Sequence, residues 1–276
     1  MNSPVSPWQR VINWRQIIPS IFTLAAMLAG FLSLLFTVEG MHASDPDISN
    51  GHFIKSALLI MMAMILDGID GNVARWLKGC SAFGAELDTY VDLTAFGIAP
   101  AVLIFAVTLV SKDPFWRMLL PSAVALSGVV RLARFKVKDP LRGQGGYAGL
   151  PITANAAWVS LFVFISLSPP RDQFSLDHGP VAMFFLMGIL VFIVLQVTLF
   201  RYPKPTKKVW IFIPCLILVV LLWLFWLLSM EKAAVRVAEA IIILGSVYVA
   251  VGPLFVKGMD AHKARKEARQ NRMNGV

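Results

Sequence analysis

Long apolar stretches alternate with short polar segments along the whole chain of 276 residues. A helix needs about 20 mostly apolar residues to cross a bilayer, and eight stretches meet or nearly meet that length. Their approximate ranges are residues 17–38, 54–74, 85–110, 115–135, 151–168, 180–200, 208–229 and 235–256. The pattern predicts an all-α, polytopic transmembrane helix bundle with about eight spans.

The composition agrees with a membrane protein. Apolar residues make up 57% of the chain and charged residues only 15%, whereas a soluble domain carries roughly a quarter charged residues. The two cysteines, Cys80 and Cys215, have no spacing typical of a zinc site or a disulfide framework. We therefore expect neither a structural metal nor a disulfide.

The charges between the apolar stretches predict the orientation of the spans. Most of the 25 Lys and Arg residues fall in segments on the same side as the N-terminus, and acidic residues are frequent on the other side. The positive-inside rule then places both termini in the cytoplasm. The net charge of +9 is explained by basic residues that face anionic lipid headgroups, so a nucleic-acid partner is not needed.

Four aspartates interrupt the second and third apolar stretches. Asp67 and Asp70 share one helix face, and Asp88 and Asp92 share another, because residues three or four apart lie on the same side of a helix. A short connection joins the two stretches, so their carboxylates can point into one cavity at the cytoplasmic surface. Such all-oxygen ligation suits Mg²⁺ or Mn²⁺, and four carboxylates suffice for a two-metal site.

Small residues and one cation accompany these aspartates. Gly71 and Ala74 leave space beside the carboxylates for a flat base or a pyrophosphate, and Arg75 offers a cation for phosphate. Gly71, Ala74 and Gly84 are equally compatible with close packing between two spans. That alternative does not account for four aspartates at helical spacing.

The complete arrangement from Asp67 to Asp92 has the form Asp-x-x-Asp-Gly-x-x-Ala-Arg, eight residues, then Gly-x-x-x-Asp-x-x-x-Asp. It resembles the signature of the CDP-alcohol phosphotransferases, which are integral membrane enzymes of phospholipid synthesis. Every fixed position of that signature is matched. The resemblance implies a six-helix catalytic core, a homodimer, and a site that faces the cytoplasm from a bacterial cytoplasmic (inner) membrane.

The resemblance also implies a role for each residue of the motif. Asp67, Asp70 and Asp88 would hold the metals, while Asp92 would contact a metal and act as the general base. The residues that would hold CDP-diacylglycerol are Gly71, Ala74, Arg75 and Gly84. One departure from relatives lies outside the motif, since Ser20 stands where asparagine is frequent.

Three further segments resemble the CDP-diacylglycerol–serine O-phosphatidyltransferase branch more than the glycerophosphate or inositol branches. They are Phe96–Ala101, Arg131–Phe135 and Gly149–Pro151. The implied reaction is metal-dependent transfer of a phosphatidyl group from CDP-diacylglycerol to the hydroxyl of L-serine, which gives phosphatidylserine and CMP. Arg131 and Arg134 could hold the lipid phosphate or the serine carboxylate, or they could anchor the helix to headgroups.

The resemblance covers roughly residues 17–200 and divides the chain. Residues 1–16 would be an N-terminal cytoplasmic or interfacial segment and residues 17–200 the membrane core. Residues 201–256 would form two additional transmembrane helices, and residues 257–276 a basic cytoplasmic tail. The segment from Arg142 to Gly149 would be either a flap over the site or a plain connector.

Two other functions compete with transfer to serine. The same chemistry could use glycerol 3-phosphate, inositol phosphate or choline as the acceptor. A cation transporter would also keep carboxylates within its spans. The grouping of Gly71, Ala74 and Arg75 and the position of the cluster near one membrane surface argue against transport.

Overall fold

The computed structural model describes residues 14–108, 110, 113–137, 146–169, 175–203 and 209–273. The predicted interfacial segment lies outside this range except for its last three residues, and so do residues Arg142–Gly145. The elements are α1 (Trp14–His42), α2 (Pro46–Trp76), α3 (Ala82–Val91), the π-helical segment η2 (Asp92–Ile98), α4 (Ala99–Val107), α5 (Pro114–Val137), β1 (Gly146–Ala148), α6 (Ile152–Leu167), α7 (Gly179–Val197), β2 (Arg201–Pro203), α8 (Val209–Leu227) and α9 (Glu231–Met273).

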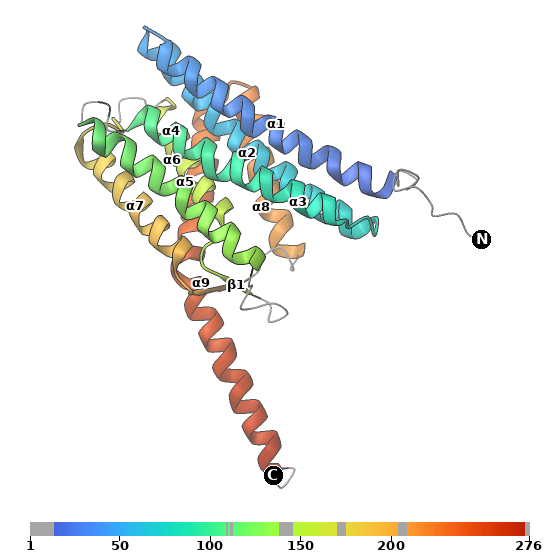
Figure 1. Ribbon diagram of the computed structural model, residues 1–276. Helices are drawn as coiled ribbons and strands as arrows, with labels where there is room; N and C mark the ends of the chain where they lie inside the picture. Colours follow the sequence, from blue (N-terminus) through green and yellow to red (C-terminus); the bar gives the residue numbers. More distant parts are fainter. Residues whose placement is uncertain are drawn as a thin grey trace.

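The described helices form an elongated bundle, which confirms an all-α polytopic membrane protein (Figure 1). Within the described residues, six helical stretches are long and apolar enough to cross a membrane: Trp14–His42, Pro46–Trp76, Ala82–Val107, Pro114–Val137, Gly179–Val197 and Glu231–Pro253. Two shorter apolar helices, Ile152–Leu167 and Leu216–Leu227, fall where the fifth and seventh spans are expected. The third predicted span is continuous through α3, η2 and α4.

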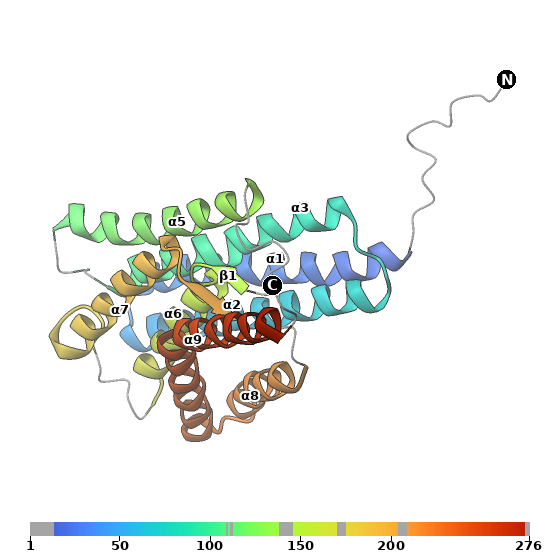
Figure 2. The same cartoon turned by 90° about the horizontal axis from the view of Figure 1, so that it is seen from below.

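Helices α1 and α2 pair along most of their length, because small residues line their contact (Figure 2). Ala26 and Ala29 on α1 and Ala57 on α2 are buried. Small side chains let helix backbones approach closely where lipid supplies no hydrophobic driving force between helices. Hydrogen bonds add to this contact, since Ser56 Oγ lies 2.8 Å from Ser33 Oγ and 2.7 Å from Thr37 Oγ1.

The π-helical segment η2 interrupts the third span, beginning at the last aspartate of the motif. Ala99 N–H bonds to Thr94 O, five residues back, and Pro100 has no N–H with which to continue the α-helical ladder. Close packing also fixes this segment, because a Cβ added to Gly30 of α1 would lie 2.6 Å from Cβ of Ala95. The span expected over 85–110 therefore contains a π-helical stretch from Asp92 to Ile98.

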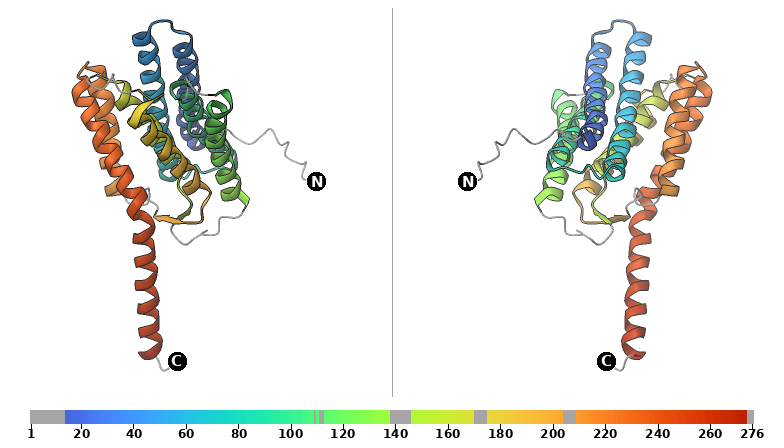
Figure 3. Two further views of the ribbon diagram at one scale, coloured as in Figure 1. Left: turned by 90° about the vertical axis from the view of Figure 1, so that its left-hand side faces the viewer. Right: turned by 90° about the vertical axis from the view of Figure 1, so that its right-hand side faces the viewer.

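The connections that follow α5 and α7 contain short strands, and the last helix is long. β1 pairs antiparallel with β2, with Tyr147 opposite Tyr202, so Gly146–Ala148 belong to a two-stranded sheet. Neither of the two forms expected for residues 142–149, a flap or a plain connector, includes this pairing. Helix α9 continues without interruption through the expected tail and projects far beyond the bundle (Figure 3).

Candidate metal and substrate site

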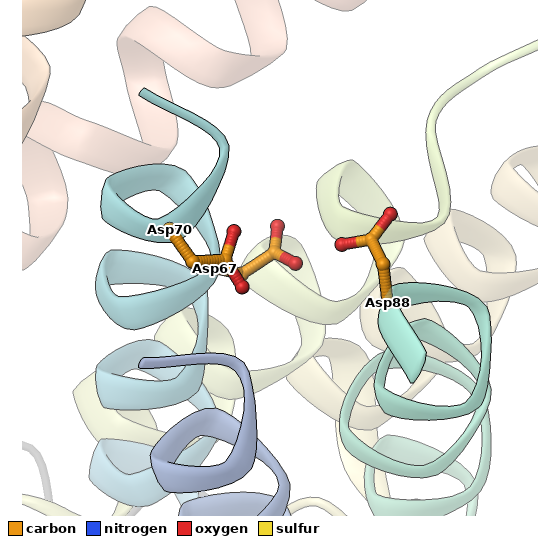
Figure 4. Close-up of side chains that lie close together, drawn as sticks. All are labelled: Asp67, Asp70 and Asp88. Carbon is orange, nitrogen blue, oxygen red and sulfur yellow. The ribbon is translucent and has the colours of Figure 1, made fainter. Parts of the chain in front are cut away.

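Three of the four predicted metal ligands meet between α2 and α3. One carboxylate oxygen from each of Asp67, Asp70 and Asp88 lies within 4.8 Å of the others. Asp67 and Asp70 extend from the last turns of α2 toward Asp88, which faces them from α3 (Figure 4). The short connection Leu77–Ser81 brings the end of α2 next to α3. The aspartates of the two helices therefore meet, as their spacing in the sequence predicts.

The environment of these carboxylates fits a bound cation. Asp70 is buried, Asp67 is half-buried and Asp88 is exposed. Oδ1 of Asp67 is buried and has no hydrogen-bond partner within the described part of the chain. A buried, unpaired carboxylate oxygen beside two other carboxylates is costly unless a cation neutralises it. The three aspartates therefore form a group that can hold a divalent metal ion.

Thr23 of α1 orients one of these ligands. Its hydroxyl donates a hydrogen bond of 2.5 Å to Oδ2 of Asp70, and both residues are buried. Metal-binding carboxylates are commonly held by such partners, which fix the direction of the ligand oxygen. Sequence reasoning missed Thr23, although its spacing of three from Ser20 places both hydroxyls on one face of α1.

A cleft of about 300 Å³ opens beside the aspartates. Its wall includes Asp70, Asp88 and all of the residues predicted to hold the nucleotide: Gly71, Ala74, Arg75 and Gly84. The other residues that line it come from α1, from the α2–α3 connection and from α3: Gln16, Pro19, Ser20, Thr23, Gly79, Cys80, Ser81 and Ala85. The first helix thus contributes to the site, including at Ser20.

The cleft has one flat wall and one cationic edge. A Cβ added to Gly71 would meet only the Arg75 guanidinium, at 3.7 Å, so this part of the helix surface is open. Arg75 Nη2 donates to Asn72 Oδ1 at 2.9 Å, and Asn72 Nδ2 donates to Gly68 O at 2.7 Å. This short chain of hydrogen bonds holds the Arg75 cation over Gly71 at the edge of the cleft.

Asp92 lies one turn beyond Asp88, at the first residue of η2. It does not belong to the group of three whose oxygens converge within 4.8 Å. It interacts electrostatically with Asp88 and with Arg131 of α5. Its roles as a metal ligand and as the general base stay predictions.

The two arginines of α5 have different surroundings. Arg131 is 8% exposed and belongs to α5, which packs against the η2 segment that begins at Asp92. Arg134 is partly buried and donates hydrogen bonds to backbone carbonyls at the end of α7 and at the end of β1. Contacts of either arginine with substrate stay predictions.

Comparisons with known proteins agree with this geometry. The family model described as CDP-alcohol phosphatidyltransferase matches residues 16–252. CDP-diacylglycerol–serine O-phosphatidyltransferase of Helicobacter pylori is 29% identical over 201 residues, which cover 72% of this chain and 77% of that protein. The Mycobacterium tuberculosis protein of the same name is 33% identical over 186 residues, or 65% of this chain and 59% of the relative.

A third relative comes from an archaeon. Archaetidylserine synthase of Methanothermobacter thermautotrophicus is 29% identical over 148 residues, which cover 52% of this chain and 57% of that protein. The family match spans most of the chain and includes the whole aspartate cluster and its cleft. The chain therefore belongs to the CDP-alcohol phosphatidyltransferase family.

Proposed function

We propose that this protein transfers the phosphatidyl group of CDP-diacylglycerol to the hydroxyl of L-serine, releasing CMP. The observation that carries the proposal is the convergence of Asp67, Asp70 and Asp88 at a cleft walled by Gly71 and Arg75. Membership of the CDP-alcohol phosphatidyltransferase family supports the reaction class. The names of the H. pylori and M. tuberculosis relatives support serine as the acceptor.

The aspartates would hold Mg²⁺ or Mn²⁺ in a two-metal site, with Asp67, Asp70 and Asp88 as ligands and Asp92 as a further one. When bound, the ions would neutralise phosphate charge and stabilise the CMP leaving group. The hydrogen bond from Thr23 would keep the Asp70 carboxylate oriented toward the metal ions. Gly71, Ala74 and Gly84 leave room for the nucleotide, and Arg75 binds its phosphate at the mouth of the cleft.

In the proposed step the serine hydroxyl oxygen forms a new bond to the phosphatidyl phosphorus. The bond between that phosphorus and the CMP oxygen breaks, and CMP leaves with the electron pair. The Asp92 carboxylate accepts the hydroxyl proton. A positioned general base of this kind contributes roughly 10²- to 10⁴-fold in rate.

The position of the site on the spans supports a membrane setting. The aspartates occupy the C-terminal part of α2 and the first half of the span Ala82–Val107, so they lie toward one end of these spans. We propose that this end faces the cytoplasm of a bacterial inner membrane, with both termini on the same side. The family resemblance further implies a homodimer, which cross-linking in native membranes would test.

An acceptor panel tests the proposed function. Purified protein with CDP-diacylglycerol and a divalent metal ion would receive L-serine, glycerol 3-phosphate, inositol phosphate or choline, and CMP release would be measured. We expect release with serine alone. CMP release with another acceptor and none with serine would show that serine is not the acceptor, while the reaction class would stand. No CMP release with any acceptor would contradict phosphatidyl transfer.

A further inference from the structure

Arg134 sits near the C-terminal end of α5 with its guanidinium surrounded by backbone carbonyls. Nη1 donates to Val197 O at 2.7 Å, and Nη2 donates to Ala148 O at 3.0 Å. Nη2 also lies 3.3 Å from both Gln196 O and Thr198 O. One side chain therefore joins three segments that are far apart in the sequence: α5, the end of β1 and the end of α7.

The carbonyls at the end of α7 are suited to a cation. The last carbonyls of a helix have no partner within the helix, and the helix dipole makes this end negative. Helix α7 ends at Val197, so Arg134 caps the helix with a planar guanidinium that can reach several acceptors at once. A lysine at this position could not span the same set.

Gly149 indicates that the neighbouring chain is built closely around Arg134. Its φ is +80°, and an added Cβ would lie 2.6 Å from Gln196 O and 2.8 Å from Arg134 Nη2. Gly149 N–H donates to Phe200 O at 2.8 Å, and Leu150 N–H donates to Leu195 O at 3.0 Å. Only glycine allows the chain after β1 to pass between the guanidinium and the end of α7.

A second contact joins the same two helices deeper in the bundle. Ser127 Oγ donates to Oε1 of the fully buried Gln196 at 2.7 Å. Ser127, Arg131 and Arg134 are separated by four and three residues, so they lie along one face of α5. Arg131 thus lies between two points at which α5 is bound to α7. Helix α5 also packs against η2, which begins at Asp92, and a Cβ added to Gly128, one turn before Arg131, would lie 3.8 Å from Cα of Gly97 in η2.

We infer that Arg134 is a positioning residue: it fixes the end of α5 against α7 and thereby holds Arg131 beside Asp92. Its effect on turnover passes through Arg131 and requires no contact between Arg134 and substrate. The kinetic part of this inference rests on the proposed phosphatidyl transfer, whereas the structural part does not.

A double-mutant cycle separates this role from general stabilisation. The variants are Arg131→Lys, Arg134→Ala, Arg134→Lys and the double variant Arg131→Lys/Arg134→Ala, all measured by CMP release. Lys136→Ala is the matched control, because it removes one cation from the same helix end but is paired with Glu86 instead of α7. The kcat of Lys136→Ala and its KM for each substrate should equal those of the original protein.

We expect Arg134→Ala to lower kcat about 10- to 100-fold, because a catalytic group that is out of place slows the chemical step. The KM values for CDP-diacylglycerol and for L-serine should change little. Arg134→Lys should recover part of this loss. The double variant should be no slower than Arg131→Lys alone, because both changes disturb the same group. Multiplied losses in the double variant would show that Arg134 acts independently of Arg131 and would overturn the inference.

Hydrogen exchange supplies a readout that does not depend on turnover. Arg134→Ala should speed exchange of the Gly149 and Leu150 amides and of α5 around residues 127–131, while Lys136→Ala should not. Unchanged exchange in α5 would contradict the inference even if the enzyme proved inactive. Absence of CMP release from the original protein would contradict the proposed function instead, so the two failures are distinguishable.

Discussion

The Thr23 hydroxyl donates a 2.5 Å hydrogen bond to Oδ2 of Asp70, and this bond joins the first helix to the aspartate cluster. The same hydroxyl lies 3.1 Å from Pro19 O, one turn earlier in α1. Both side chains are mostly buried. The direction of the Asp70 carboxylate is therefore set by a helix that contributes none of the four aspartates.

Replacing Thr23 by valine should weaken metal binding while leaving the fold intact. Valine keeps the shape of threonine but removes the donor, and loss of such a partner typically costs about 10- to 100-fold in metal affinity. A metal titration of CMP release would measure the change. Thr23→Ser keeps a hydroxyl and should retain most of the affinity. Equal metal dependence of Thr23→Val and the original protein would remove Thr23 from the site.

Replacing Asp88 by asparagine should abolish metal binding and raise stability in the absence of metal. Three carboxylates with oxygens within 4.8 Å repel one another, and the amide removes one negative charge. The thermal midpoint in a chelator should rise, and added Mg²⁺ or Mn²⁺ should no longer increase it.

The control for this experiment is Asp47→Asn, at the opposite end of α2 and exposed to solvent. It should keep the metal-dependent rise in the thermal midpoint. If Asp88→Asn responds to metal as strongly as Asp47→Asn does, the cluster is not a metal site.

The motif spacing was sufficient to predict the cluster because it rests on local helical geometry. Asp67 and Asp70 share a face of α2, Asp88 lies on α3, and a short connection brings the two helices together. The nucleotide-side residues, including Gly71 and Arg75, then necessarily line the same cleft. Helix periodicity alone therefore gives the main outline of the site.

Other features depend on contacts between segments distant in sequence, which periodicity does not encode. Thr23 reaches Asp70 across an interface of two helices, and Arg134 reaches carbonyls more than 60 residues away. The π-helical segment from Asp92 to Ile98 packs against α1 and α5, and a count of apolar residues does not reveal it. These contacts become visible only when the helices are packed.

Replacing Gly71 by leucine should raise the KM for CDP-diacylglycerol with little effect on stability. The added side chain has open space in front of it, since the nearest atom to a new Cβ is Arg75 Nη1 at 3.7 Å. Leucine would then fill the cleft in place of the nucleotide. Steady-state kinetics at varied CDP-diacylglycerol measures the effect.

Gly51→Leu serves as the control on the same helix. A Cβ there meets nothing within 4 Å. Gly51 lies near the start of α2, whereas Asp67 and Asp70 lie toward its other end. It should leave the KM unchanged. A similar KM for both variants would argue against nucleotide binding along Gly71.

Replacing Ser56 by alanine should destabilise the protein without changing its chemistry. Ser56 Oγ makes hydrogen bonds of 2.8 Å and 2.7 Å to Ser33 and Thr37, and all three residues are fully buried. Interhelical hydrogen bonds in membranes contribute about 0.6 kcal/mol on average, so we expect a loss of about 1 kcal/mol in the free energy of unfolding.

Unfolding in mixed micelles of increasing denaturing detergent would measure this loss. Ser122→Ala is the control, because Ser122 is exposed and bonds only to Met118 O of its own helix. A change in kcat in Ser56→Ala with no change in stability would contradict a purely structural role for this network.

In the proposed reaction the aspartate cluster, loaded with metal, transfers a phosphatidyl group to serine. The most direct measurement is incorporation of labelled L-serine into lipid by purified protein supplied with CDP-diacylglycerol, with and without a divalent metal ion. We predict metal-dependent labelling, matched mole for mole by CMP release and abolished in Asp88→Asn. Labelling that persists in a chelator and in Asp88→Asn would contradict the claim.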